Sequence, residues 1–222
     1  MAATTHLRMP NSVIFICDIQ EKFRTAIHEF DKVVLTSSKV LRAAAILDIP
    51  VVATTQNRAR LGDTVPELSA LFSVEPASSS SDEKKARLLV EADKSLFSMW
   101  TPAVETAMAS ASTASPSSSP PTVVIVGIES HICVTQTALD LLAAGYRVYV
   151  LADGVSSCNR EEVPVALARL RASGVTVTTS ESWLYETMGS ASIPAFRQVV
   201  GLVKDTSAST KASLSSLLSS RI

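Results

Sequence analysis

The sequence has few charged residues and no long hydrophobic run. Charged residues are 18% of the 222, and 20 Lys and Arg nearly balance 21 Asp and Glu, so the net charge is −1. Such a balance argues against a large basic surface for nucleic acid. No apolar run approaches the roughly 18 residues that span a membrane, and residues 1–12 lack the apolar core of a signal peptide. We therefore expect a cytoplasmic protein without nucleic-acid or membrane partners.

Cysteine is also scarce. Cys17, Cys133 and Cys158 are odd in number and far apart in the chain. This pattern is typical of reduced thiols in an intracellular protein and argues against a disulfide framework. The final tripeptide, Ser-Arg-Ile, loosely resembles a peroxisomal signal of the Ser-Lys-Leu type, so a peroxisomal location is the alternative to a cytoplasmic one.

What the sequence does contain is a regular alternation of apolar strand-like runs and amphipathic helical patterns. The expected strands are 12–18, 49–55, 86–93, 122–127, 146–153 and 175–180, and the expected helices are 31–48, 101–110, 134–145, 161–174, 181–189 and 193–205. Buried strands joined by helix-sized connections pair in parallel. We predict one Rossmann-like α/β domain over residues 11–204, with three αβα layers around a six-stranded, mostly parallel sheet.

Four segments fall outside this pattern. Residues 1–10 form an N-terminal tail, and the Ser-rich segments 77–85 and 110–121 have no apolar residues to bury, so we expect them to be surface insertions. Residues 205–222 are also biased towards serine. This low-complexity C-terminal tail is a candidate for disorder.

Three reactive side chains follow three of the expected strands. Asp18 ends the first strand, Lys94 comes just after the third, and Cys133 follows the fourth. Since the active sites of open parallel sheets lie at the carboxyl ends of the strands, these groups are expected to converge. Each also has an ordinary interpretation, as a turn cap, a solvated lysine and a small core residue. We interpret Cys17 as a core residue on the opposite face of its strand from Asp18.

The segments "FICDIQEKF", "ADKSLFSMW" and "VVIVGIESHICV", in this order, resemble the isochorismatase-like cysteine hydrolase superfamily. The eukaryotic isochorismatase domain-containing group is the most similar, and "TVPEL", "LDLLAAGYRVYVLADGVSS" and "ALARLRASGVTVTTSES" resemble it too. The resemblance covers about residues 11–204, apart from the Ser-rich segments. It implies an isochorismatase-like fold.

The resemblance also implies roles for individual residues. Asp18 matches the catalytic aspartate in D-x-Q-x-x-F, Lys94 the catalytic lysine, and Cys133 the nucleophile. In the family the peptide bond between the residues that match Ile128 and Glu129 is cis, and it turns a backbone N–H towards the substrate. The amides of Glu129 and Cys133 are then the expected oxyanion donors. A helix N-terminus and a nearby ammonium group would both favour the Cys133 thiolate.

The sequence departs from the nicotinamidases of this family, which bind a metal just after the second strand. The corresponding segment here, "TTQNRARLGDTVPEL", contains no histidine, and His6, His28 and His131 are too scattered to replace it. We therefore predict no metal and no cofactor.

Several residues lie where the family places substrate-facing side chains. An arginine there would suit an anionic substrate group, and aromatic residues could line an apolar pocket, although solvated arginines and core aromatics are the ordinary interpretations. The substrate-binding candidates are Gln56, Arg58, Arg60, Phe97, Trp100 and His131.

These patterns predict a cysteine-dependent hydrolase. Cleavage of a vinyl ether by protonation needs no thiol, so Cys133 favours acyl transfer on a small amide, imide or carbamoyl compound through a thioester. The alternative is a non-catalytic, oligomeric family member that serves as a binding or scaffold protein. In either case we expect a homo-oligomer, a dimer or larger.

Overall fold

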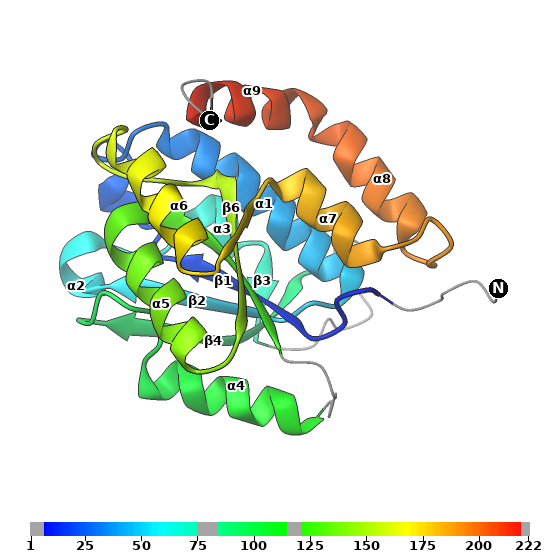
Figure 1. Ribbon diagram of the computed structural model, residues 1–222, viewed down its shortest axis with the longest axis horizontal. Helices are drawn as coiled ribbons and strands as arrows, with labels where there is room; N and C mark the ends of the chain where they lie inside the picture. The colour runs from blue at the N-terminus through cyan, green and yellow to red at the C-terminus, as the bar shows by residue number, and fades with distance from the viewer. Residues whose placement is uncertain (1–6, 75–83, 115–120, 219–222) are drawn as a thin grey trace.

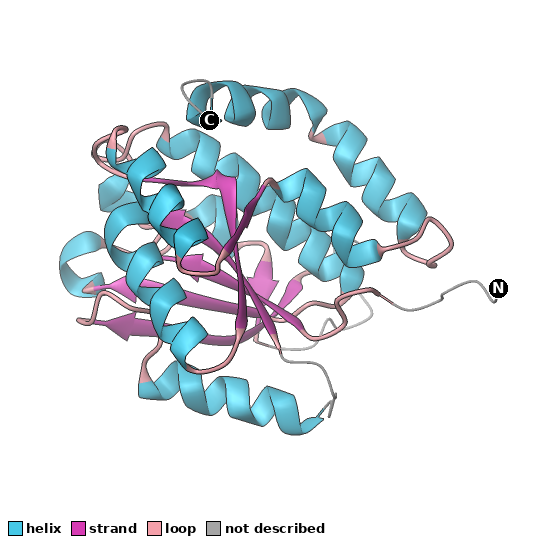
Figure 2. Ribbon diagram, in the orientation of Figure 1, coloured by secondary structure: helices cyan, strands magenta, loops and turns pink. Residues whose placement is uncertain are grey.

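All strands of the sheet run parallel. The computed structural model describes residues 7–74, 84–114 and 121–218. The sheet order is β3 (Phe72–Ser73), β4 (Ala86–Lys94), β2 (Val51–Gln56), β1 (Ser12–Cys17), β5 (Thr122–Ile128), β6 (Arg147–Ser156) and β7 (Thr176–Thr178). The three-layer α/β fold is confirmed (Figures 1 and 2). Each of the six expected strands is present, and β3 adds a short seventh strand at one edge.

Helices cover both faces of the sheet. One face packs against α1 (Phe30–Leu47), α7 (Ser180–Met188) and α8 (Phe196–Asp205), and the other against α4 (Pro102–Ala114), α5 (Thr135–Ala143) and α6 (Glu162–Ala172) (Figure 1). Two short helices, α2 (Arg58–Leu61) and α3 (Pro66–Ser69), follow β2. Among the described residues, no helix combines the length and the apolar character needed to cross a membrane.

Strand β1 lies at the centre of the sheet and is buried along its whole length. Its side chains alternate between the two faces, as a pleated strand requires. Ile14 and Ile16 pack in the layer of α1, whereas Phe15 and Cys17 pack in the layer of α4, α5 and α6. Both helical layers therefore pack against this one strand. Its carboxyl end lies in the middle of the row formed by the carboxyl ends of the parallel strands.

The described part of the C-terminal segment, up to Leu218, is helical, although its composition suggested disorder. Helix α9 (Ser207–Leu218) packs against α1 and β6 and runs along the top of the molecule in Figure 1. The Nζ atom of Lys39 donates to Thr210 Oγ1 at 2.9 Å, and Ser213 Oγ donates to Lys32 O at 3.3 Å. Thr210 and Ser213 thus form hydrogen bonds with α1. Composition alone does not reveal such contacts between distant segments.

Other segments singled out by composition lie largely outside the described residues. These are most of the N-terminal tail, residues 77–83 and 115–120 of the Ser-rich segments, and the final tripeptide. The start of the second Ser-rich segment, up to Ala114, belongs to helix α4.

Candidate active site

A buried ion pair lies at the carboxyl ends of β1 and β4. Lys94 Nζ is 2.7 Å from Asp18 Oδ2, and the two side chains are only 1% and 2% exposed. Thr54, at the end of β2, donates through Oγ1 to Asp18 Oδ1 at 2.7 Å. Both carboxylate oxygens of Asp18 therefore have a partner, as a charge removed from water requires.

Lys94 has further acceptors around its ammonium group. Nζ donates to Gln56 Oε1 at 2.8 Å and to the carbonyl oxygens of Leu96 and Phe97, both at 3.1 Å. These carbonyls belong to the loop that follows β4, so the loop folds back over its own lysine. The ammonium group is thereby fixed in position from several sides.

Burial and the neighbouring charges have opposite effects on the pKa of Lys94. Burial alone would lower the pKa, but the negative charges that Cys17, Asp18 and Cys133 can carry, together with the hydrogen bond to Asp18, outweigh burial and raise it. Lys94 therefore stays positively charged at neutral pH. Cys133 is close enough for its charge to contribute to this shift.

Cys133 lies in a π-helical turn, η2 (Ser130–Val134), between β5 and α5. The turn begins at Glu129, which has left-handed dihedrals (φ 56°, ψ 67°). The Glu129 carbonyl accepts from the amides of Ile132 at 2.9 Å and Val134 at 3.2 Å, which lie on either side of the Cys133 amide. This wide turn places the thiol of Cys133 just before α5, beside the ends of β1 and β4.

The predicted cis bond between Ile128 and Glu129 is absent. Every peptide bond in the described residues is trans. The chain reverses through backbone dihedrals instead, with φ 141° at Gly127 and φ 56° at Glu129. The amides of Glu129 and Cys133 remain the predicted oxyanion donors.

Cys17 is a buried core residue, as predicted, but its thiol also contacts Asp18 in this site. Asp18 has a left-handed φ of 52°, which breaks the alternation of the strand and turns its carboxylate back towards the preceding thiol. Cys17 Sγ lies 3.7 Å from Asp18 Oδ2. A hydrogen bond with Cys133, burial and the charge of Asp18 raise the pKa of Cys17 well above its usual value. Cys17 therefore remains a protonated thiol.

Comparison with known proteins identifies the family of this chain. The Isochorismatase domain family matches residues 12–182. The chain belongs to the isochorismatase domain family. It is 39% identical to isochorismatase domain-containing protein 2 of Xenopus laevis over 88% of this chain and 84% of that protein.

Two solved structures have a similar fold. The structure of the MAR1 ribonuclease from Caenorhabditis elegans matches with a TM-score of 0.74 and 34% identity, over 90% of this chain and 92% of that one. The Escherichia coli YcaC protein, described as an octameric hydrolase of unknown specificity, matches with a TM-score of 0.64 and 18% identity, over 99% and 94% of the two chains. At that identity the second match supports the fold alone.

Three polar substrate-binding candidates of this isochorismatase-domain protein lie at the end of β2. Gln56 contacts Lys94 and belongs to the site. Arg58 is 3.2 Å from Glu91 and 3.6 Å from Asp63, so acidic neighbours balance its charge. Arg60 is exposed on α2.

The other three substrate-binding candidates lie on different elements. Phe97 is 52% exposed and contributes its carbonyl to Lys94. Trp100 packs edge-on against Tyr146, with ring centroids 5.2 Å apart. His131 Nδ1 lies 3.0 Å from Ser157 Oγ, so this nitrogen faces the end of β6.

Two residues that support the site were not singled out from the sequence. Gln20 is buried. Its Oε1 accepts from the backbone N–H of Gln56 at 2.7 Å, and its Nε2 donates to Gly62 O at 2.6 Å. Thr137 Oγ1 donates to Cys133 O at 2.6 Å and accepts from the Met99 amide at 2.8 Å. Gln20 is the glutamine of the D-x-Q-x-x-F motif, which could have indicated its importance. Thr137 has no comparable signal.

Gly127 allows β5 to approach β1 at the site. A Cβ atom there would lie 2.2 Å from Cys17 O. We expect Gly127→Ala to lower the free energy of unfolding by about 2–3 kcal/mol, measured by urea denaturation, because the clash adds to an unfavourable φ. The matched control is Gly145→Ala, which has a positive φ but no atom within 4 Å, and it should cost about 1 kcal/mol. Equal losses in the two variants would contradict the steric explanation.

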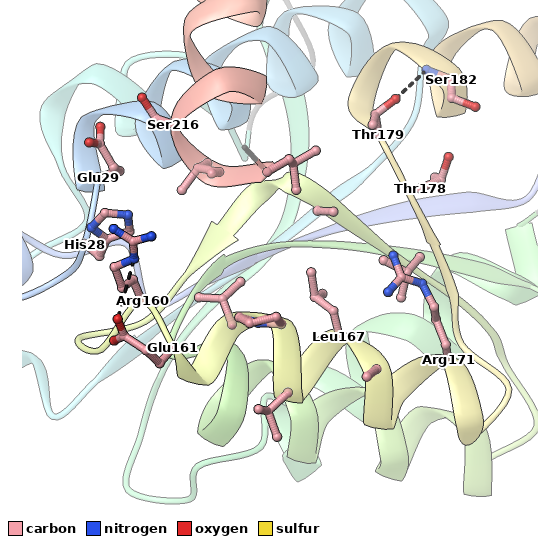
Figure 3. Close-up of a pocket in the computed structure, with 18 residues that line it drawn as sticks. His28, Glu29, Arg160, Glu161, Leu167, Arg171, Thr178, Thr179, Ser182 and Ser216 are labelled. Atoms are coloured by element: carbon pink, nitrogen blue, oxygen red, sulfur yellow. Dashed lines mark hydrogen bonds and ion pairs between the residues drawn. The ribbon is translucent and has the colours of Figure 1, made fainter. Parts of the chain in front are cut away.

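A cavity of about 930 Å³ lies elsewhere, between α6, the ends of β6 and β7, and α9. Figure 3 shows Arg160 and Glu161 near one end of α6 and Arg171 near the other, with Ser216 of α9 above them. Asp18, Lys94 and Cys133 do not line it. The cavity is therefore separate from the candidate active site.

Proposed function

We propose that the protein hydrolyses a C–N bond of a small amide, imide or carbamoyl compound, with Cys133 as the nucleophile. The observation that carries this proposal is the buried Asp18–Lys94 pair, with Nζ and Oδ2 2.7 Å apart, beside the Cys133 thiol. A buried ammonium group favours a neighbouring thiolate, and a carboxylate can accept and return a proton. Membership of the isochorismatase domain family supports a hydrolase.

The proposed reaction has two stages. Asp18 takes the proton of the Cys133 thiol, and the sulfur attacks the carbonyl carbon while the amides of Glu129 and Cys133 hold the oxyanion. The C–N bond then breaks as Asp18 returns the proton to nitrogen, which leaves a thioester. Asp18 next takes a proton from water, the resulting hydroxide displaces the sulfur to release the carboxylic acid product, and Asp18 returns the proton to the sulfur, which restores the thiol.

The proposal assigns Lys94 and Cys17 positioning roles. The permanent charge of Lys94 holds the Asp18 carboxylate and stabilises the Cys133 thiolate. Cys17 keeps its proton, because its pKa is raised by the hydrogen bond with Cys133 and by burial. It can therefore donate to a neighbouring anion without competing as a nucleophile.

The experiment that tests the proposal is a screen for ammonia or amine release. The panel contains small amides, carbamoyl compounds and cyclic imides, with RNA added because a similar solved structure is named a ribonuclease. We expect turnover of at least one small C–N compound by the wild type and none by Cys133→Ala. Hydrolysis of RNA alone would contradict the proposal. Absence of turnover together with an unreactive Cys133 would favour the binding or scaffold alternative.

Selective alkylation gives an independent prediction. At pH 7 we expect iodoacetamide to modify Cys133 at least about tenfold faster than Cys17 or Cys158, because only the thiolate reacts. The pKa of Cys17 is raised by its hydrogen bond with Cys133 and by burial, and that of the exposed Cys158 by partial loss of hydration and by the charge of Glu129. Peptide mass spectrometry after timed quenching measures the three rates. Faster labelling of another cysteine would count against an activated Cys133.

We also propose that the chain forms a homo-oligomer. The support is the name of the YcaC structure, which describes that protein as octameric. Sedimentation at micromolar concentration tests this, and a monomer would contradict it.

A further inference from the structure

A second group of reactive side chains lies at the turn that leads to Cys133. Glu129 and His131 come from the turn after β5, and Cys158 from the loop after β6. One potential ligand atom from each of the three lies within 4.8 Å of the others. Glu129 Oε2 is 3.4 Å from His131 Nδ1 and accepts from the Cys158 amide at 3.3 Å. The hydrolase mechanism uses none of these three side chains.

The chemistry of the three groups is that of a zinc site. Thiolate, imidazole and carboxylate are the ligands that Zn²⁺ takes in proteins, at about 2.0–2.3 Å. At tetrahedral angles, such bond lengths place neighbouring nitrogen and oxygen ligands about 3.3 Å apart. The observed 3.4 Å between Glu129 and His131 already matches this spacing.

The cluster is also open to an ion from solvent. Cys158 is exposed, whereas Glu129 and His131 are half-buried and therefore partly held in place. Nδ1 of His131 contacts Ser157 Oγ at 3.0 Å, and this contact would be exchanged for the bond to the metal. A site with three protein ligands leaves one position for water, which is the arrangement of open zinc sites.

We propose that Glu129, His131 and Cys158 bind one divalent cation of the zinc class, with water completing the coordination. The Cys158 thiol gives its proton to solvent as the metal–sulfur bond forms. The prediction of no metal was based on the spacing of histidines. This set has only one histidine, and its third ligand belongs to another strand connection, so the spacing along the chain resembles no standard motif.

Such an ion would join the turn after β5 to the loop after β6. Glu129 is the first residue of the turn that carries Cys133, and its amide is one of the predicted oxyanion donors. The ion would therefore restrict the backbone that precedes the nucleophile without contacting the nucleophile itself. The inference does not depend on the proposed hydrolase reaction.

The test is a spectroscopic titration of the metal-free full-length protein with Co²⁺, which replaces Zn²⁺ in such sites. We expect a sulfur-to-cobalt charge-transfer band that is absent from Cys158→Ser and retained in Cys133→Ala and Cys17→Ala. His131→Ala should keep the band but bind Co²⁺ at least about tenfold more weakly, since it loses one of three protein ligands. Circular dichroism verifies that each variant is folded.

The spectra of the variants distinguish an ion bound through Cys158 from an ion bound through Cys133. A band that disappears in Cys133→Ala but persists in Cys158→Ser would place the ion at the candidate active site and overturn the proposal. Absence of any thiolate band at millimolar Co²⁺ would also overturn it. Competition by Zn²⁺ that removes the band from the wild type would support it.

Discussion

Replacement of Cys133 by alanine is expected to lower kcat for a C–N substrate by at least about a thousandfold. The change removes the sulfur that forms the thioester, and no other described side chain can take its place. Cys17 is next to it, but its raised pKa keeps it protonated. Initial rates of ammonia release, measured at saturating substrate, give the comparison.

The stability of this variant should hardly change. Cys133 is 6% exposed, and alanine removes a single atom and leaves only a small cavity, so we expect a difference below about 1 kcal/mol in the free energy of unfolding. The control is Asp140→Asn, which neutralises an exposed carboxylate on α5 and should leave kcat unchanged. Activity of the Cys133 variant within tenfold of the wild type would remove the cysteine from the mechanism.

The second large effect concerns the buried ion pair. Lys94→Met should lower the free energy of unfolding by about 3–5 kcal/mol, because it leaves the Asp18 carboxylate buried without a positive partner. Thr54 still bonds to Asp18, but a hydroxyl does not compensate for a charge. Urea denaturation at pH 7 measures the loss, with Lys22→Met as the exposed control.

A double variant separates the charge from the packing. Asp18→Asn combined with Lys94→Met removes both charges, so it should be more stable than Lys94→Met alone. If the double variant is no more stable than the single one, burial of an unpaired carboxylate is not the cause of the loss.

The pH dependence of this effect follows from the raised pKa of Lys94. Between the usual lysine value of about 10.4 and the raised value, the folded protein binds more protons than the unfolded chain. The contribution of the pair is therefore complete below about pH 10 and declines as the pH rises further. We expect the stability difference between wild type and Lys94→Met to decrease in that range.

Much of the architecture was predictable because buried parallel strands have a strong pattern. The apolar runs at 12–18 and 122–127 contain the two central strands, and the rule that strand ends carry chemistry selected Asp18, Lys94 and Cys133, which the structure brings together. This reasoning needs only the order of elements along the chain.

What could not be predicted depends on single dihedral angles and on contacts between distant segments. The left-handed φ of Asp18 turns its carboxylate towards the thiol of Cys17, although regular strand alternation would place these two side chains on opposite faces. The turn at Glu129 is made without the cis bond that the resemblance implied. Helix α9 is stabilised by bonds to α1, far from it in sequence, so composition alone gave the wrong expectation for this segment.

The central position of β1 has a consequence for how the chain is made. This strand emerges early in synthesis, yet it needs both β2 and β5 as partners, and β5 lies in the second half of the chain. Such non-local pairing gives a high contact order and slow folding. Until Ile128 has left the ribosome, the nascent polypeptide therefore holds a largely apolar strand with one edge of unpaired backbone N–H and C=O groups, a feature that favours aggregation.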